Sequence, residues 1–119
     1  MTFEGPRSLA FTAALAADDK KAVDTIVLEV GGLLQITEFF VVTGAANRRL
    51  VRTIVEAVEE EVRLHHDRSP IRVEGLSELQ WVLMDYGDVV VHVFIDEMRT
   101  YYEIERLYRD VPHLEWQRA

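Results

Sequence analysis

Apolar side chains recur every three or four positions between residues 47 and 66. The recurring positions are Leu50, Val51, Ile54, Val55, Val58 and Val62. This spacing places them along one side of a helix, while the glutamates of the segment fall outside the stripe and face water. Asn47 precedes the first turn and is a residue type that caps helix N-termini. The pattern predicts an amphipathic helix with one buried face.

A second pattern, over residues 81–95, predicts a β-hairpin. Its flanks are rich in Val, Phe, Tyr and Trp, which favour strands, and Gly87 supplies the positive φ that a tight turn requires. We place a two-residue loop at Tyr86-Gly87. This loop pairs the following positions across the hairpin: Asp85 with Asp88, Leu83 with Val90, and Trp81 with His92.

The hairpin then has two different faces, because side chains alternate along a strand. One face is apolar and consists of Val82, Met84, Val89, Val91 and Val93. The other face carries Trp81, Leu83, Asp85, Asp88, Val90, His92 and Phe94. A three-residue loop would shift the register by one and mix the two sets, so we choose the loop that separates apolar from polar side chains. We expect the first face in the core and the second at the surface.

The rest of the chain predicts two more helices and three more strands. The helices are expected over residues 8–17 and from residue 96 to a stop at 110–112, with Asp96 as the cap of the second. The strands are expected over residues 24–30, 39–43 and 71–74. The expected fold is α/β (α+β), a mixed five-stranded sheet with helices packed on one face. We expect one domain over residues 1–119, with a core over 8–110 and loose tails.

Composition narrows the class of protein. The 119 residues are 49% hydrophobic, which is enough for a sizeable core in one domain. The absence of cysteine excludes disulfides and thiolate metal sites. No apolar run is long enough to span a membrane, and the N-terminus lacks a signal pattern. We therefore expect a cytoplasmic protein with no membrane partner.

The formal net charge of −8 bears on the partner. It disfavours a direct grip on nucleic acid, which needs lysines and arginines to neutralise phosphates. It suits a basic protein partner, although acidity also serves solubility alone. Arg48, Arg49 and Arg52 form the densest basic cluster, and they are either a contact for a phosphate or acidic patch or an ordinary solvated turn.

Catalytic patterns are weak. Asp85, Asp88 and His92 share a predicted face and could bind a divalent metal or act as an acid–base pair. However, aspartates that flank a turn often serve local hydrogen bonds, and the histidine lies too far along the ribbon to share one ion easily. His65 and His66 are adjacent on a helix and point in different directions, so they lack the spacing of a metal pair. We expect no cofactor, no metal and no enzymatic activity.

Recognition is the alternative use of the hairpin surface. Trp81 and Tyr86 stand beside apolar side chains and are rimmed by Asp85 and Asp88, which is the composition of an interface hot spot. The competing interpretation is that Trp81 is simply a core residue.

Several segments carry a family resemblance. They are 18–22, 36–40, 43–44, 73–75 and 81–94, followed by Arg99, Tyr102, Glu105, Arg106, Leu107 and Asp110. In this order and spacing they resemble the ribosomal silencing factor family, also called Iojap-like. The family usually has an aspartate where this chain has Glu38.

The resemblance implies a mechanism without chemistry. Members of this family bind the large (50S) ribosomal subunit through ribosomal protein L-fourteen and sterically block joining of the 30S subunit, which represses translation under nutrient limitation. The resemblance also implies a nucleotidyltransferase-like topology, without the catalytic motif in this chain, and a homodimer in solution. Two alternatives stay open: a metal-dependent nucleotidyltransferase or phosphohydrolase-like enzyme, and a homodimeric scaffold protein.

The hairpin pattern and the resemblance together predict a partner-binding site for the large-subunit protein. Its expected members are Trp81, Leu83, Asp85, Tyr86, Asp88, Val90, His92, Phe94 and Tyr102. Arg99 and Glu105 are expected either to join the contact or to pair with each other in the last helix.

Overall fold

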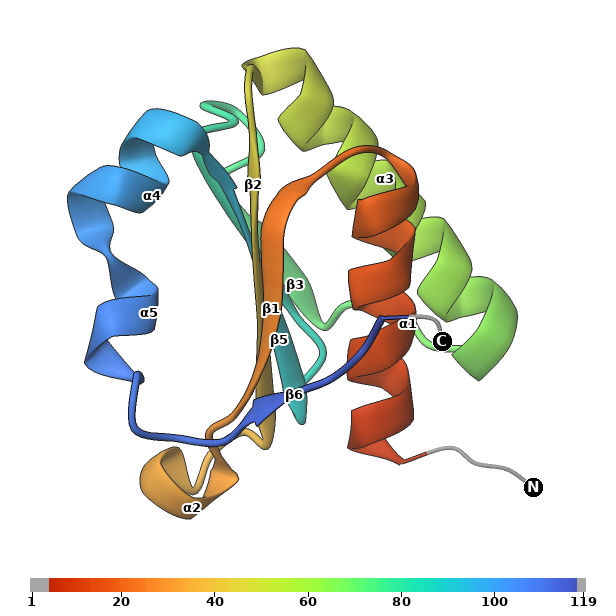
Figure 1. Cartoon of the computed structure of the whole chain (residues 1–119). Helices are drawn as coiled ribbons and strands as arrows, with labels where there is room; N and C mark the ends of the chain where they lie inside the picture. Colours follow the sequence, from red (N-terminus) through yellow and green to blue (C-terminus); the bar gives the residue numbers. More distant parts are fainter. Residues whose placement is uncertain (1–4, 118–119) are drawn as a thin grey trace.

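A mixed sheet separates two layers of helices (Figure 1), in a computed structural model that describes residues 5–117. The helices are α1 (Pro6–Asp19), α2 (Gly31–Leu34), α3 (Arg48–His66), α4 (Asp96–Tyr102) and α5 (Ile104–Leu107). The strands are β1 (Val23–Glu29), β2 (Phe39–Ala45), β3 (Arg72–Glu74), β4 (Trp81–Asp85), β5 (Val89–Ile95) and β6 (His113–Leu114). The predicted α+β class with a mixed sheet is confirmed.

The sheet has six strands within the described residues, in the order β3-β4-β5-β2-β1-β6. Strands β2 and β5 pair in parallel, and the other neighbours pair antiparallel. All seven residues of β2 are buried, because this continuous apolar run lies in the middle of the sheet and is covered on both faces.

The prediction of five strands was wrong because β6 lies in the segment expected to be a loose tail. Its two residues pair with Val27 and Leu28 of β1. Trp116, just beyond β6, is buried, and its indole N–H donates to the Thr25 carbonyl at 3.0 Å. Residues 118–119 and 1–4 of the predicted tails lie outside the described residues.

One face of the sheet is covered by α1 and α3 (Figure 1). The predicted stripe of α3 is buried here, except that Leu50 is only partly buried. The Asn47 side chain caps the helix by accepting a hydrogen bond from the Leu50 N–H at 2.8 Å. The buried side of α1 is mostly alanine, namely Ala10, Ala13, Ala14, Ala16 and Ala17. These small side chains let α1 lie close to both α3 and the sheet.

Helices α4 and α5 lie on the opposite face, so the prediction of helices on a single face was wrong (Figure 1). A second core fills the space beneath them and contains Leu28, Val30, Phe40, Val42, Phe94 and Ile104. The single last helix that was expected breaks at Glu103, whose φ is +49°. Asp96 is the first residue of α4, and Ile95 occupies the capping position instead.

Arg99 ties α4 to the start of β1. Its guanidinium donates to the backbone carbonyls of Val23 at 2.9 Å and Asp24 at 2.7 Å, and its Nε donates to Glu105 at 2.9 Å. The expected pairing of Arg99 with Glu105 is therefore confirmed. Gly44 makes room for α4, because a Cβ there would lie 2.9 Å from a carboxylate oxygen of Asp96 and 3.4 Å from a guanidinium nitrogen of Arg99.

The hairpin turn lies one residue later than predicted, at Gly87-Asp88. The observed pairs are Asp85 with Val90, Leu83 with His92, and Trp81 with Phe94. The Tyr86 N–H donates to the Val89 carbonyl at 2.9 Å, and Gly87, with φ of +92°, takes the first central position of the turn. Because the pairing shifts by two residues, the predicted division of the two strands into faces survives.

Candidate functional site

The outer surface of the hairpin forms a mixed apolar and acidic face beside α4. We call it the hairpin face and define it by Trp81, Leu83, Asp85, Val90 and Tyr102. The strand residues point to the side of the sheet that α4 and α5 cover only in part, and all five side chains keep some exposure to solvent. Five of the nine predicted contact residues thus lie on one accessible surface.

Trp81 is held rigidly within this face. Its ring stacks on Phe94 with centroids 4.8 Å apart and meets Tyr102 at the same centroid distance. Its indole N–H donates to Nδ1 of His92 at 3.1 Å. An aromatic side chain that is already ordered loses little conformational freedom on binding, which is the property of an interface anchor.

His92 is buried and serves Trp81 rather than the surface. Since its Nδ1 accepts the indole hydrogen bond, the ring hydrogen sits on Nε2, which has no hydrogen-bond partner among residues 5–117. Burial lowers the pKa of His92 to about 4, so the ring is neutral near pH 7. The neutral ring is the form that can accept the Trp81 hydrogen bond.

Three predicted contact residues are buried, and this corrects their expected role. Tyr86, His92 and Phe94 are all less than 5% exposed. With the turn at Gly87-Asp88, Tyr86 directly follows β4 and precedes the turn, and its side chain joins the core beneath α3. Burial raises the pKa of Tyr86. Phe94 lies under Trp81, in the core beneath α4. None of the three presents its side chain to a partner in this structure.

The acidic residues of the hairpin end are engaged locally. Asp88 accepts two hydrogen bonds from Arg68, at 2.9 and 3.0 Å, and this contact raises the pKa of the arginine. Asp85 accepts from the Gly87 N–H at 2.8 Å and lies 3.4 Å from Arg72. Both carboxylates keep part of their surface exposed. They can therefore hold the turn and still face a basic partner.

The structure does not assemble the constellation of Asp85, Asp88 and His92 that was weighed as a metal or acid–base site. The two carboxylates bind different arginines, and the imidazole is directed to Trp81. Among residues 5–117, no three histidine, aspartate or glutamate side chains are placed to hold one metal ion. The arrangement is suited to recognition.

Two residues that sequence reasoning missed stand beside the hairpin face. Ile36 is 84% exposed and Ile71 is 73% exposed, and both border a groove with Leu83 and Val90. Ile36 lies in the short loop between α2 and β2, where no periodic pattern indicates its direction. Ile71 directly precedes β3 and was expected inside that strand.

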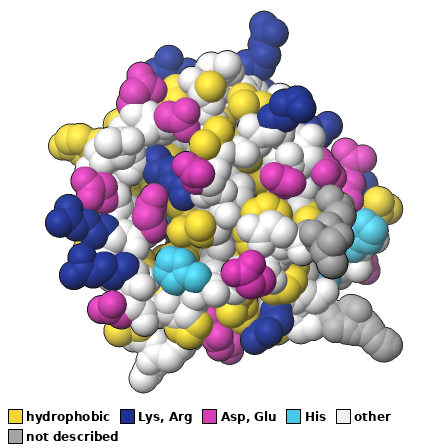
Figure 2. Space-filling view, in the orientation of Figure 1, with side chains coloured by type: hydrophobic (Ala, Val, Ile, Leu, Met, Phe, Trp, Pro, Cys, Tyr) yellow, Lys and Arg dark blue, Asp and Glu magenta, His cyan; other side chains and the backbone are white. Residues whose placement is uncertain are grey.

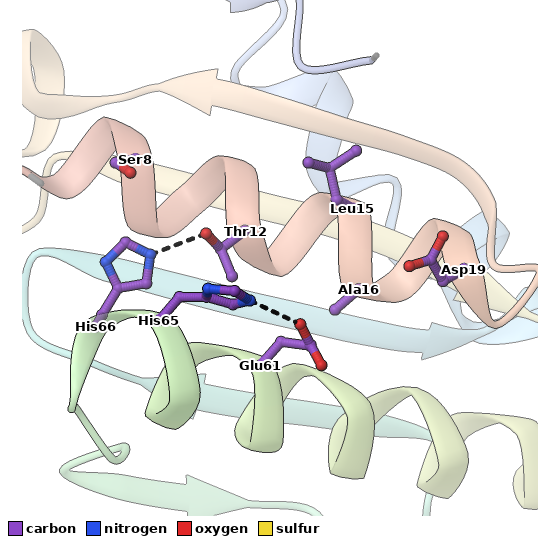
Figure 3. Close-up of a pocket in the computed structure, with 8 residues that line it drawn as sticks. All are labelled: Ser8, Thr12, Leu15, Ala16, Asp19, Glu61, His65 and His66. Carbon is purple, nitrogen blue, oxygen red and sulfur yellow. Dashed lines mark hydrogen bonds and ion pairs between the residues drawn. The ribbon is translucent and has the colours of Figure 1, made fainter. Parts of the chain in front are cut away.

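A hollow of about 420 Å³ lies between α1 and α3, on the other side of the sheet (Figure 3). His66 contacts the Thr12 hydroxyl at 2.8 Å, and His65 pairs with Glu61 at 3.2 Å, so the two adjacent histidines point to different partners. The pKa of His66 is lowered mainly by burial and further by the charge of the neighbouring His65. The hydrogen bond between Thr12 and His66 fastens α1 to the C-terminal end of α3, whereas His65 and Glu61 pair within α3.

Charge is dispersed on the face of the molecule that Figure 2 shows. Figure 2 shows acidic and basic side chains interspersed over the face seen in Figure 1, so neither sign gathers into one large patch there. In the basic cluster at the start of α3, Arg48 donates to the Glu78 carbonyl at 3.0 Å. This contact gives Arg48 a role in holding the loop before the hairpin.

Comparison with known proteins decides the family. The model of the family described as ribosomal silencing factor during starvation matches residues 4–119. The chain belongs to the ribosomal silencing factor family. A ribosomal silencing factor of Bacillus subtilis is 37% identical over 110 residues, covering 89% of each chain. A chloroplastic Iojap protein of Arabidopsis thaliana is 33% identical over 91% of this chain and 45% of its own length.

The fold agrees with the family. A crystal structure of a protein from Chromobacterium violaceum aligns with a TM-score of 0.84 and 29% identity, covering 89% of this chain and 88% of that one. The resemblance drawn from the sequence is thus confirmed, and ribosomal silencing is a regulatory role in translation, with the ribosome as partner. In the described part of this silencing factor, no helix is long and apolar enough to cross a membrane.

Proposed function

We propose that this protein binds ribosomal protein L-fourteen on the large ribosomal subunit through the hairpin face. Bound there, it occupies the surface on which the small subunit docks, so the two subunits cannot join. Because fewer ribosomes are joined, the rate of translation decreases when nutrients are limiting. The action requires no covalent bond to be made or broken. This action places the protein in the cytoplasm, with the ribosomes.

The rigid placement of Trp81 carries the proposal. An ordered aromatic ring on an accessible, partly apolar face is the kind of residue that contributes most to protein–protein affinity. Trp81 is fixed from three sides, by Phe94, His92 and Tyr102, and remains partly exposed. A tryptophan that served only the core would be covered.

Charge supports a ribosomal protein as the partner. The chain carries a net charge of −8, and Asp85 stands at the edge of the hairpin face. Ribosomal proteins are generally basic, so opposite charge speeds encounter and orients the two surfaces. A second copy of this chain would instead meet like charge on the same face. If two copies pair through this face, we expect the dimer to compete with ribosome binding, because both contacts use the same surface.

Affinity for purified L-fourteen tests the proposal. We expect Trp81→Ala to weaken binding by about 2 kcal/mol, or roughly thirtyfold in Kd, because it removes the anchor of the face. Biolayer interferometry with immobilised L-fourteen measures the change, and thermal melting checks that each variant is folded. Leu64→Ala is the matched control, because Leu64 is 64% exposed on α3, across the sheet.

Two results would contradict the proposal. One is that the unmodified protein shows no measurable affinity for L-fourteen or for large subunits. The other is that a folded Trp81→Ala protein binds as tightly as the Leu64→Ala control.

A further inference from the structure

A groove of about 390 Å³ opens at the edge of the hairpin face, next to the turn at Gly87, and shares Leu83, Asp85 and Val90 with that face. Its apolar walls are Leu34, Ile36, Phe40, Ile71, Leu83 and Val90. These residues come from four segments that are far apart in the sequence: the end of α2 with its following loop, β2, the residue before β3, and the hairpin. The groove is thus a product of the tertiary fold.

The two rims of the groove are unusually uncovered. Ile36 is 84% exposed and Ile71 is 73% exposed, while Phe40 beneath them is buried. Single exposed apolar residues are common on protein surfaces, but here two of them border one concave apolar surface. Ile71 also lies over the turn, because a Cβ on Gly87 would meet its Cδ1 at 3.2 Å. The turn needs glycine for its φ of +92°.

The surroundings of the groove carry an excess of negative charge. Four carboxylates are close to the groove. Asp85 lines the groove itself, and Glu38 and Asp88 line the adjoining hollow. Glu74 pairs with Arg72, which also lines the groove. Two guanidinium groups, Arg68 and Arg72, accompany them. Glu38 is exposed and has no ion pair within residues 5–117. A basic group would therefore be attracted to this end of the molecule.

We propose that this groove is a second anchor site, which receives one or two apolar side chains from a basic segment of the large-subunit protein. A cavity of about 150 Å³ holds a benzene molecule, so a groove of this size has room for such side chains. A lysine or arginine beside the inserted side chain meets Glu38. The inference rests on the proposed function and extends the contact beyond the hairpin face, to the loop after α2.

Equilibrium binding to purified large subunits tests the groove. The protein carries a fluorescent label, and the test variant is the double substitution Ile36→Ser with Ile71→Ser. Both residues are mostly exposed, so the variant is expected to stay folded, which thermal melting checks. We expect roughly tenfold weaker binding or more. The matched control, Leu64→Ser on α3, is expected to bind within about twofold of the unmodified protein, because its 64% exposed side chain lies outside the groove.

A charge reversal gives an independent arm. We expect Glu38→Lys to weaken binding and to reduce its dependence on salt, because an attraction to a basic segment is replaced by repulsion. Glu56→Lys on α3 makes the same charge change at an exposed site away from the groove and is expected to have less effect.

The outcomes separate this inference from the function on which it rests. If the unmodified protein and the Leu64→Ser control bind large subunits but the double variant binds equally well, the groove is not an anchor and the proposed function stands. If the double variant instead changes only self-association in sedimentation velocity, the occupant is a second copy, and the assignment to the ribosome is overturned. If the unmodified protein does not bind, the proposed function itself fails.

Discussion

At the scale of single residues, the buried His92 orients its partly exposed neighbour Trp81. A buried imidazole without a partner for its N–H costs stability, but burial also lowers the pKa of His92 and so keeps the ring neutral and able to accept a hydrogen bond. The accepted hydrogen bond fixes the indole of Trp81, which is the anchor of the proposed contact. Stability given up in the core thus improves order at the surface.

The pKa of His92 predicts a pH-dependent contribution to stability. The unfolded chain takes up a proton near pH 6.5, whereas the folded ring does so only near pH 4, so acid favours the unfolded state. This contribution is intact above pH 6.5 and is lost as the pH falls from 6.5 to 4. We expect the unmodified protein to lose about 2 kcal/mol more than His92→Asn between pH 7 and pH 4.5.

Denaturant unfolding of both proteins at the two pH values measures this difference. Asparagine is the matched replacement, because its side-chain oxygen can accept from the Trp81 indole and does not titrate. Equal losses of stability in the two proteins would show that His92 does not carry the effect.

Tyr86 gives a second prediction at this scale. Its ring is buried in the core while its hydroxyl finds no hydrogen-bond partner within residues 5–117. We expect Tyr86→Ala to cost about 3 to 5 kcal/mol, as aromatic truncations in cores do, and Tyr86→Phe to change stability by less than about 1 kcal/mol. Chemical denaturation compares the three proteins. If the Tyr86→Ala protein is as stable as the unmodified one, Tyr86 is not a core residue.

Much of the hairpin could be predicted from alternation, and its errors have a physical cause. The predicted faces are correct, since a register shift of two preserves them. The turn was placed one residue early, because glycine serves either central position of a primed turn. That displacement put Tyr86 in the loop instead of the core. His92 and Phe94 were assigned to the correct side of the sheet, but alternation alone does not show that α4 and α5 cover that side.

The second helical layer decides what remains open at the scale of secondary-structure elements. Helices α4 and α5 cover Phe94 and Phe40 but leave Leu83 and Val90 accessible at the hairpin end. These short helices depend on Arg99 for attachment to β1, since neither is long enough to be stable alone. Their position therefore sets the extent of the hairpin face.

Removing this attachment should loosen the layer. We expect Arg99→Ala to destabilise the protein by about 2 to 4 kcal/mol, because it breaks three charge-assisted hydrogen bonds of a mostly buried side chain. Hydrogen exchange should accelerate in α4 and α5 more than in α3. Arg106→Ala is the control, since its pair with Glu103 is exposed, and is expected to cost less than about 0.5 kcal/mol. Equal effects of the two substitutions would contradict the role of Arg99.

Strand β6 and α2 show where sequence patterns end. A strand of two residues and a helix of four contain too few positions for a period to be visible, so tertiary pairing defines them. The long elements, α3 and β2, were placed within a few residues because burial on one side or on both leaves a clear pattern.

The sheet separates two tasks at the scale of the whole molecule. The side that carries α1 and α3 holds the larger core, and the opposite side carries the hairpin face and the groove. With a net charge of −8, the molecule is drawn toward basic surfaces as a whole, while Trp81 and the groove give the contact its position. The exposure of residues such as Ile36 and Ile71 is a result of the tertiary fold, and the periodicity of the sequence does not predict it.

Sedimentation with separated ribosomal subunits tests the central claim most directly. The purified protein is mixed with large and small subunits at a magnesium concentration that allows joining, and the mixture is resolved on a sucrose gradient. The account predicts that the protein travels with the large subunit, not the small one, and that the yield of joined ribosomes falls. A protein that stays at the top of the gradient and leaves joining unchanged would contradict the account.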